Sequence, residues 1–171
     1  MTKHTLIFSL ALFTSFFTFG QDNWDASGIA DSLKKDADAV IRYFSTDYKR
    51  SAIDRYQKTV DYVVTVLNEN GKSAADLRIY YDKNIEVKSV ELSIFDGNGQ
   101  LVKEIKKKEI NDYAYLNSYT MFSDSRVKQY SPSYNYYPYT VSYSYSIESK
   151  TVVSFPNWHP TDWFDIAVEK A

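Results

Sequence analysis

The stretch from Tyr139 to Ile147 constrains the fold more than any other part of this sequence. Its odd positions carry Tyr, Val, Tyr, Tyr and Ile, and its even positions carry Thr and Ser. Successive side chains of a β-strand point to opposite faces, so this alternation gives one apolar face and one hydroxyl face. A helix would spread the same residues around its circumference, and the pattern therefore predicts a half-buried strand. Such a strand needs a sheet, and its apolar face needs a second layer.

Other segments carry strand or turn patterns of their own. Alternating or β-branched runs predict strands over 39–44, 59–67, 75–81, 87–95, 101–108, 150–155 and 165–170. Asn68–Gly71 and Asp96–Gly99 are typical of hairpin turns, because Asn and Gly tolerate positive φ. We expect 75–81 to pair with 59–67, and 150–155 to pair with the Tyr139–Ile147 strand. The segments 47–55 and 112–135 show no period, and we interpret them as a loop or ragged strand end and as a long connection. Residues 24–35 predict a short helix.

Two charged motifs have competing interpretations. Asp96-Gly97-Asn98-Gly99 begins like a calcium loop, but the sixth and twelfth positions hold Leu101 and Lys107 instead of Gly and Glu. We therefore expect a tight hairpin and no metal. The three lysines at 106–108 lie between Glu104 and Glu109, which favours a solvated edge strand over a patch that binds nucleic acid or acidic lipid.

The first 20 residues predict a signal peptide. Lys3 precedes an apolar run from Leu6 to Phe19, and small residues at Thr18 and Gly20 indicate cleavage before Gln21. The run is shorter than the roughly 20 residues of a spanning helix, so an uncleaved anchor is the less favoured alternative. We expect export to the periplasm, the cell surface or the medium, with no membrane contact after cleavage.

Composition narrows the function of the mature chain, 21–171. The chain has no Cys, which excludes disulfides, thiolate metal sites and a Cys nucleophile from these residues. The whole sequence has 20 Lys and Arg against 22 Asp and Glu, and this balance argues against a nucleic-acid partner. The 16 tyrosines all follow the leader. They suit partly solvent-exposed surfaces, because each side chain has an apolar ring and a polar hydroxyl.

Candidate functional residues gather near the C-terminus. In an enzyme, His159 would act as a base oriented by Asp162 or Asp165, but no nucleophile motif accompanies it. In a binding domain, exposed aromatic side chains would form a platform for a glycan or an extended peptide, with His159 beside them. The residues of this predicted ligand site are Tyr136, Tyr137, Trp158, His159 and Trp163.

Several stretches together resemble a known family. They are 38–42, 66–72, Phe95–Gln100, Ser123–Arg126, Pro138–Tyr143 and Ile166–Glu169. They are similar to the domain of unknown function that precedes a transglutaminase-like domain in exported bacterial proteins. The resemblance implies an antiparallel β-sandwich followed by a papain-like Cys-His-Asp domain. No residue of this chain matches the transglutaminase nucleophile, so the resemblance implies no catalysis here.

These observations together predict a mainly β fold, an antiparallel β-sandwich with a short N-terminal helix, formed by residues 21–171 as a single domain. The chain stops within a strand pattern, and we expect it to be truncated at the C-terminus. The predicted function is that of a non-catalytic accessory module that packs on or orients a C-terminal transglutaminase-like domain. A periplasmic or surface glycan- or peptide-binding domain is the alternative, and we expect no cofactor.

Overall fold

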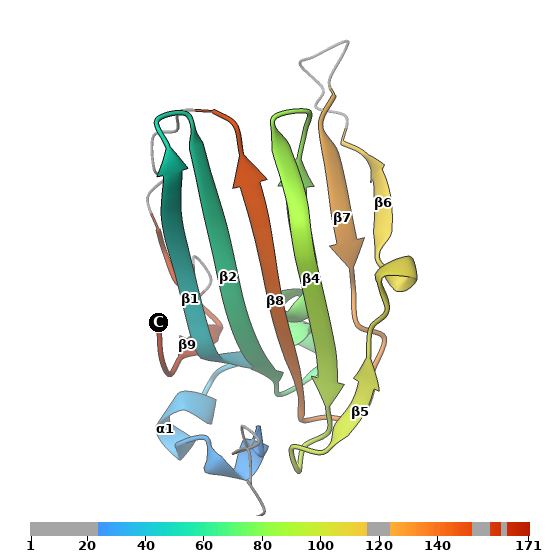
Figure 1. The fold of residues 1–171 in the computed structure, drawn as a ribbon. Helices are drawn as coiled ribbons and strands as arrows, with labels where there is room; N and C mark the ends of the chain where they lie inside the picture. The colour runs from blue at the N-terminus through green and yellow to red at the C-terminus, as the bar shows by residue number, and fades with distance from the viewer. Residues whose placement is uncertain (1–23, 116–123, 152–157, 162–163) are drawn as a thin grey trace, which may run out of the picture.

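The computed structural model describes residues 24–115, 124–151, 158–161 and 164–171, and shows a mainly β molecule (Figure 1). The predicted leader and Trp163 lie outside these residues. The elements, in chain order, are η1 (Ala26–Gly28), α1 (Asp31–Lys34), β1 (Ala39–Ala52), β2 (Arg55–Val66), η2 (Glu69–Ala75), β3 (Leu77–Tyr81), β4 (Ile85–Phe95), β5 (Leu101–Glu104), η3 (Lys107–Glu109), β6 (Asn111–Ala114), β7 (Arg126–Tyr130), β8 (Tyr139–Ser149) and β9 (Ile166–Val168).

The strands form two sheets. The large sheet has the order β5-β4-β8-β2-β1-β9, and the small sheet has the order β3-β7-β6. Neighbouring strands are antiparallel except β1 and β9. Figure 1 shows the long strands β1, β2, β8 and β4 side by side, with α1 below the end of β1. The predicted mainly β, antiparallel fold with a short N-terminal helix is confirmed.

Strand β8 lies in the interior of the large sheet, as the Tyr and Ser alternation requires. It pairs with β2 from Tyr139 opposite Val66 to Ser149 opposite Tyr56. Its other edge pairs with β4. Both edges of β8 are thus occupied, by β2 and by β4. Residues 152–155 of the strand predicted to pair with β8 lie outside the described residues.

The apolar face of the large sheet, called the inner face here, packs on the small sheet. Val64 and Val141 stand opposite each other on β2 and β8, and both are fully buried. They belong to one hydrophobic cluster with Leu77 and Ile79 of β3. This cluster joins the two layers and makes the molecule a sandwich.

The other face of the large sheet, the outer face, carries hydroxyls that pair across strands. Thr65 and Thr140 hydroxyls lie 2.8 Å apart, and Ser89 and Ser146 hydroxyls lie 2.6 Å apart. The N-terminal segment covers one end of this face, where Ile29 packs on Val40 in a second small cluster. Thr65 and Thr140 are fully buried at this end, and their hydroxyl pair satisfies polar groups that are shielded from water.

The structure decides two sequence interpretations in the first half of the chain. Of the two alternatives for 47–55, the strand end is present and the loop is not: β1 continues to Ala52 and pairs with β2, with an irregularity between Arg50 and Ala52. Its side chains are mostly exposed at this end, so no hydrophobic period marks it. Asn68–Gly71 is not a hairpin: Asn68 accepts a hydrogen bond from the Asn70 amide (3.0 Å) and caps η2. The next strand, β3, consequently pairs with β7 and not with β2.

The middle of the chain also departs from expectation. The Asp96–Gly99 hairpin is confirmed, with Gly99 at φ 76° between β4 and β5. The strand predicted over 101–108 ends at Glu104; Lys106 is the N-cap of η3, and Lys107 and Lys108 lie in it. The long connection contains β6 and β7, which sequence reasoning missed because four of the five β7 side chains and all β6 side chains are only partly buried or exposed.

Strand β9 lies at the edge of the large sheet and runs parallel to β1. Its register places Ala39 opposite Ile166 and Ile41 opposite Val168. The Glu169 amide donates to the Ile41 carbonyl (2.8 Å), and the Phe44 amide donates to the Lys170 carbonyl (3.0 Å). The strand predicted near the C-terminus is thus present, and it joins the beginning of the described chain to its end.

Candidate functional site

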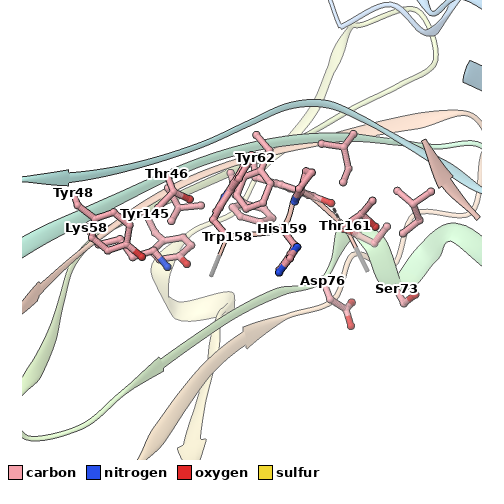
Figure 2. A pocket seen from close by; sticks show the side chains of 17 residues that line it. Thr46, Tyr48, Lys58, Tyr62, Ser73, Asp76, Tyr145, Trp158, His159 and Thr161 are labelled. Carbon is pink, nitrogen blue, oxygen red and sulfur yellow. Dashed lines mark hydrogen bonds between the residues drawn. The ribbon is translucent and has the colours of Figure 1, made fainter. Parts of the chain in front are cut away.

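A hollow of about 400 Å³ opens on the inner face of the large sheet. Its floor comes from β1, β2 and β8, and its rim comes from η2 and from residues 158–161 (Figure 2). We call it the inner-face pocket. Its lining includes Phe44, Thr46, Tyr48, Lys58, Tyr62, Ser73, Asp76, Tyr143, Tyr145, Trp158, His159 and Thr161.

Four rings form a row across the floor of the pocket. Strand register places Phe44 opposite Tyr62 and Tyr62 opposite Tyr143. The ring centroids of Phe44 and Tyr62 are 5.3 Å apart, and those of Tyr62 and Tyr143 are 4.9 Å apart. Trp158 extends the row, 5.3 Å from Phe44. Cross-strand aromatic pairs of this kind stabilise a sheet and offer ring faces to a ligand.

Tyr62 holds the rim above the floor. Its hydroxyl donates to the Ala74 carbonyl of η2 (3.2 Å). Burial raises the pKa of Tyr62, so the phenol stays neutral and remains a donor. Burial likewise raises the pKa of Tyr145 to about 12. The tyrosines of the floor are therefore neutral groups at physiological pH.

Lys58 places a positive charge at one end of the pocket. Its ammonium lies 5.8 Å from the centroid of the Tyr48 ring, and no described carboxylate pairs with it. Burial lowers the pKa of Lys58, because the charged form loses hydration there. A half-buried cation without an anion is uncommon in a folded protein.

Asp76 lies toward the other end, near η2, and Figure 2 shows it well separated from Lys58. Lys58 is four residues from Tyr62, which is about 13 Å along a strand. The Asp76 carboxylate is occupied by Arg78, 2.9 Å away. The pocket therefore has one unpaired cation and one neutralised acid.

His159 is the histidine that the structure describes, and its ring stands among the pocket side chains (Figure 2). No described residue forms a hydrogen bond with it. Asp165 accepts the Asp38 amide through its main-chain carbonyl (2.7 Å) and makes no contact that orients the imidazole. Asp162 lies outside the described residues. The imidazole of His159 therefore offers a ligand its ring face and its nitrogen atoms. No described carboxylate is placed to make it a catalytic base.

The predicted ligand site is only partly assembled. Trp158 and His159 both line the inner-face pocket, whereas Tyr136 and Tyr137 do not. Tyr136 is 77% exposed and packs on Tyr134, with ring centroids 5.5 Å apart. Tyr137 packs on Tyr139 (5.7 Å), beside the core. Sequence reasoning missed Lys58 and Thr46, although alternation along β2 would have placed Lys58 on the same face as Tyr62.

A second hollow, of about 520 Å³, lies over Ser142 and Ser144 beside Trp24. Its two cations differ from Lys58. Arg42 is bonded to the Glu169 carboxylate (2.5 Å), and Lys170 is exposed, so its ammonium stays hydrated. This hollow is therefore less suited to recruit an anion than the inner-face pocket.

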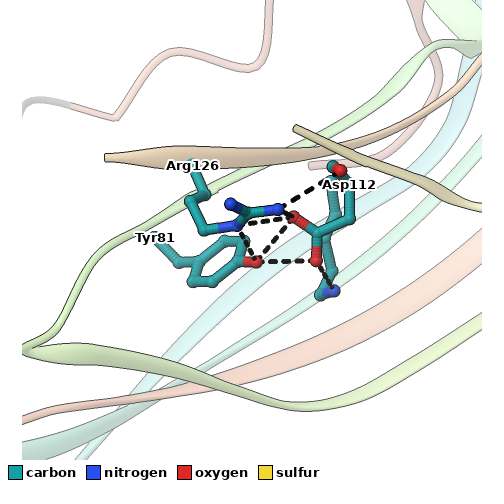
Figure 3. A network of polar contacts seen from close by, with 4 residues as sticks. Tyr81, Asp112 and Arg126 are labelled. Carbon is teal, nitrogen blue, oxygen red and sulfur yellow. Dashed lines mark hydrogen bonds and ion pairs between the residues drawn. The ribbon is translucent and has the colours of Figure 1, made fainter. Parts of the chain in front are cut away.

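A polar cluster on the small sheet surrounds Asp112 (Figure 3). Its carboxylate accepts from Tyr81 (2.7 and 2.6 Å), Arg126 (2.9 Å) and Lys128 (2.5 Å). Burial alone would raise the pKa of Asp112, but these three donors outweigh it and lower the pKa to about 2. The donors saturate the carboxylate, so the cluster links β3, β6 and β7 and leaves little for a ligand.

The described residues contain no group of His, Asp and Glu side chains placed to hold a metal ion. None of the described helices has the length and apolarity needed to cross a bilayer.

Comparison with known proteins gives a family and likenesses to solved structures. No curated protein matches the sequence. A crystal structure described as a putative protease from Parabacteroides distasonis superposes with a TM-score of 0.54 at 12% identity, over 72% of this chain. The chain spans 24% of that protein's length. Residues 54–169 match the domain of unknown function DUF3857, and the chain therefore belongs to this family.

Proposed function

We propose that this domain is a non-catalytic accessory module of a longer exported protein, in which it packs on or orients a following transglutaminase-like domain. The observation that supports this most is the share of the structural match. The same sandwich accounts for 24% of a longer protein described as a putative protease. The fold thus occurs there as a minor part of a larger molecule.

The geometry of β9 suits such a role. Its parallel pairing with β1 fixes the chain up to Lys170 at the edge of the large sheet. Arg42, whose side chain is 9% exposed, holds Glu169 of the same segment. A domain that followed Ala171 would start from a rigid point, which restricts its orientation.

The reading frame beyond Ala171 tests the proposal. We expect it to continue into a domain that carries Cys, His and Asp in a papain-like arrangement. The protein with both domains should show a higher unfolding midpoint for the second domain than that domain shows alone. A stop codon after Ala171, or identical midpoints for the joined and separate domains, would overturn the accessory role.

Export is tested separately. The mature protein is expected outside the inner membrane with Gln21 as its first residue. N-terminal sequencing that begins at Met1 would contradict the leader.

The inner-face pocket supports a second function, the binding of a glycan or an extended peptide. Trp158 and the ring row provide apolar surface, and Lys58 and His159 provide polar contacts without described partners. Its volume of about 400 Å³ lies within the range of about 300–1,000 Å³ that is usual for small-molecule sites. Titration of the protein with oligosaccharides and peptides, followed by tryptophan fluorescence, tests this function. Trp158→Ala should remove the signal.

A further inference from the structure

The chemistry of the inner-face pocket can be narrowed further. We propose that it binds an acidic glycan, with a sugar ring on the aromatic row and the carboxylate of an acidic sugar on Lys58. This inference rests on the second function proposed above and adds the charge and the class of the ligand.

The negative charge of the proposed ligand is inferred from Lys58. The Lys58 side chain is half-buried, its ammonium lies 5.8 Å from the centroid of the Tyr48 ring, and no described acid neutralises it. Removing a cation from water without a counterion costs free energy, and a ligand carboxylate would recover that free energy. The lowered pKa of Lys58 is consistent with this, since a nearby anion would have raised it.

The opposite end of the pocket limits how many adjacent negative charges the ligand can carry. Asp76 contributes a carboxylate there, and Arg78 neutralises it at 2.9 Å. A ligand with several adjacent negative charges, such as a phosphate chain, would meet one cation and then an acid. The pocket therefore suits isolated carboxylates that are separated by neutral rings.

The side chains that line the pocket indicate which kind of ring the ligand carries. A pyranose presents an apolar face and a rim of hydroxyls. Trp158, 46% exposed, offers an indole face beside Phe44. Hydroxyl side chains of Thr46 and Ser73 stand around the same hollow. Rings below and hydroxyls at the sides match a sugar better than an aliphatic peptide side chain.

The test compares an acidic oligosaccharide with a neutral one of equal length. The probes are a trimer of galacturonic acid and its methyl ester, which keeps the ring and removes the charge. Binding to the mature chain is measured by isothermal titration calorimetry at low and high salt. We expect the acid to bind about tenfold more tightly than the ester at low salt, and this difference to shrink as salt rises.

Two lysine substitutions locate the charge. Lys58→Gln should reduce affinity for the acid about tenfold and leave the affinity for the ester unchanged. Lys49→Gln is the matched control, because Lys49 is exposed on β1 and does not line the pocket. It should change neither affinity. Lys58→Gln removes an unpaired half-buried charge, so the variant should fold, and an unchanged urea midpoint verifies this.

The outcomes separate this inference from the function on which it rests. Equal affinity for acid and ester, or an unchanged affinity after Lys58→Gln, would overturn the charge assignment while glycan binding stands. Tight binding of an acidic peptide with no binding of either sugar would overturn the sugar assignment. If no oligosaccharide or peptide bound at millimolar concentration, both the inference and the second function would fail.

Discussion

At the residue scale, two tyrosines of the core differ in whether their hydroxyl has a partner. Tyr139 is fully buried, and its hydroxyl has no hydrogen-bond partner among the described residues. The Tyr62 hydroxyl donates to the Ala74 carbonyl. A buried polar group without a partner lowers stability, whereas a paired one contributes to it.

Replacing each tyrosine by Phe should therefore have opposite effects. Tyr139→Phe removes the unpaired hydroxyl and is expected to raise the free energy of unfolding by about 1 kcal/mol. Tyr62→Phe removes a hydrogen bond and should lower it by about 1 kcal/mol. Urea denaturation followed by tryptophan fluorescence measures both. A loss of stability in Tyr139→Phe equal to that in Tyr62→Phe would show that the Tyr139 hydroxyl has a partner.

The sequence predicted pocket residues best where they lie close together along the chain. Trp158 and His159 were identified because two Trp, a His and two Pro crowd into nine residues, and both side chains line the pocket. Lys58 was missed. What distinguishes it is the absence of a described acid around it, and that depends on the packing of residues far apart in the sequence.

At the element scale, η2 depends on close backbone contact with the start of β1. A Cβ added to Gly71 would lie 2.2 Å from the Asp38 carbonyl oxygen. That oxygen already accepts the Leu67 amide at 2.9 Å, so it cannot withdraw freely. Glycine is thus required at this position by contact and not by a positive φ.

Gly71→Ala is accordingly expected to lower the free energy of unfolding by about 2–4 kcal/mol, because either η2 or the start of β1 must shift. Gly28→Ala is the control: Gly28 is exposed, and the nearest atom to its added Cβ is 3.9 Å away. It should change stability by no more than about 0.5 kcal/mol. Thermal unfolding compares the two, and equal midpoints would show that η2 lies away from Asp38.

Elements were predicted well where alternation is long, and pairing was predicted poorly. Tyr139–Ile147 gave a strand and its faces correctly, because side-chain alternation is a local property. Asn68–Gly71 suggested a hairpin, but the chain forms η2 and crosses to the small sheet. The short strands β6 and β7 carry too few buried residues to leave a pattern. Sheet order depends on contacts between distant segments, which periodicity does not contain.

At the scale of the whole molecule, several carboxylates have a lowered pKa in the folded state. Hydrogen bonds from the Ser27 amide, Lys34, Lys88 and Lys103 lower the pKa values of Asp25, Asp31, Glu86 and Glu109 in turn. These four carboxylates are exposed or only partly buried, and each contributes little to stability. Asp112, at about 2, has the largest shift among them.

Stability should therefore fall in acid. A carboxyl with a lower pKa in the folded state stabilises the fold above its unfolded pKa, near 4, and this contribution is lost as the pH falls toward 2. We expect Asp112 to contribute about 1–2 kcal/mol to the loss. Urea denaturation between pH 5 and pH 2 measures the slope.

Asp112→Asn should flatten that slope, because the titrating group is gone. Asp124→Asn is the control, since Asp124 and Lys83 form an exposed ion pair at 3.6 Å. If both variants kept the slope of the original protein, the acid sensitivity would come from other carboxylates.

The parallel register of β1 and β9 has a mechanical consequence. Tension applied between the chain ahead of Ala39 and the chain beyond Val168 would pull these two strands in opposite directions along their length. Their backbone bonds would then share the load in shear, and would not open one after another as in an antiparallel hairpin pulled from its ends. The sandwich would resist stretching until these bonds failed together.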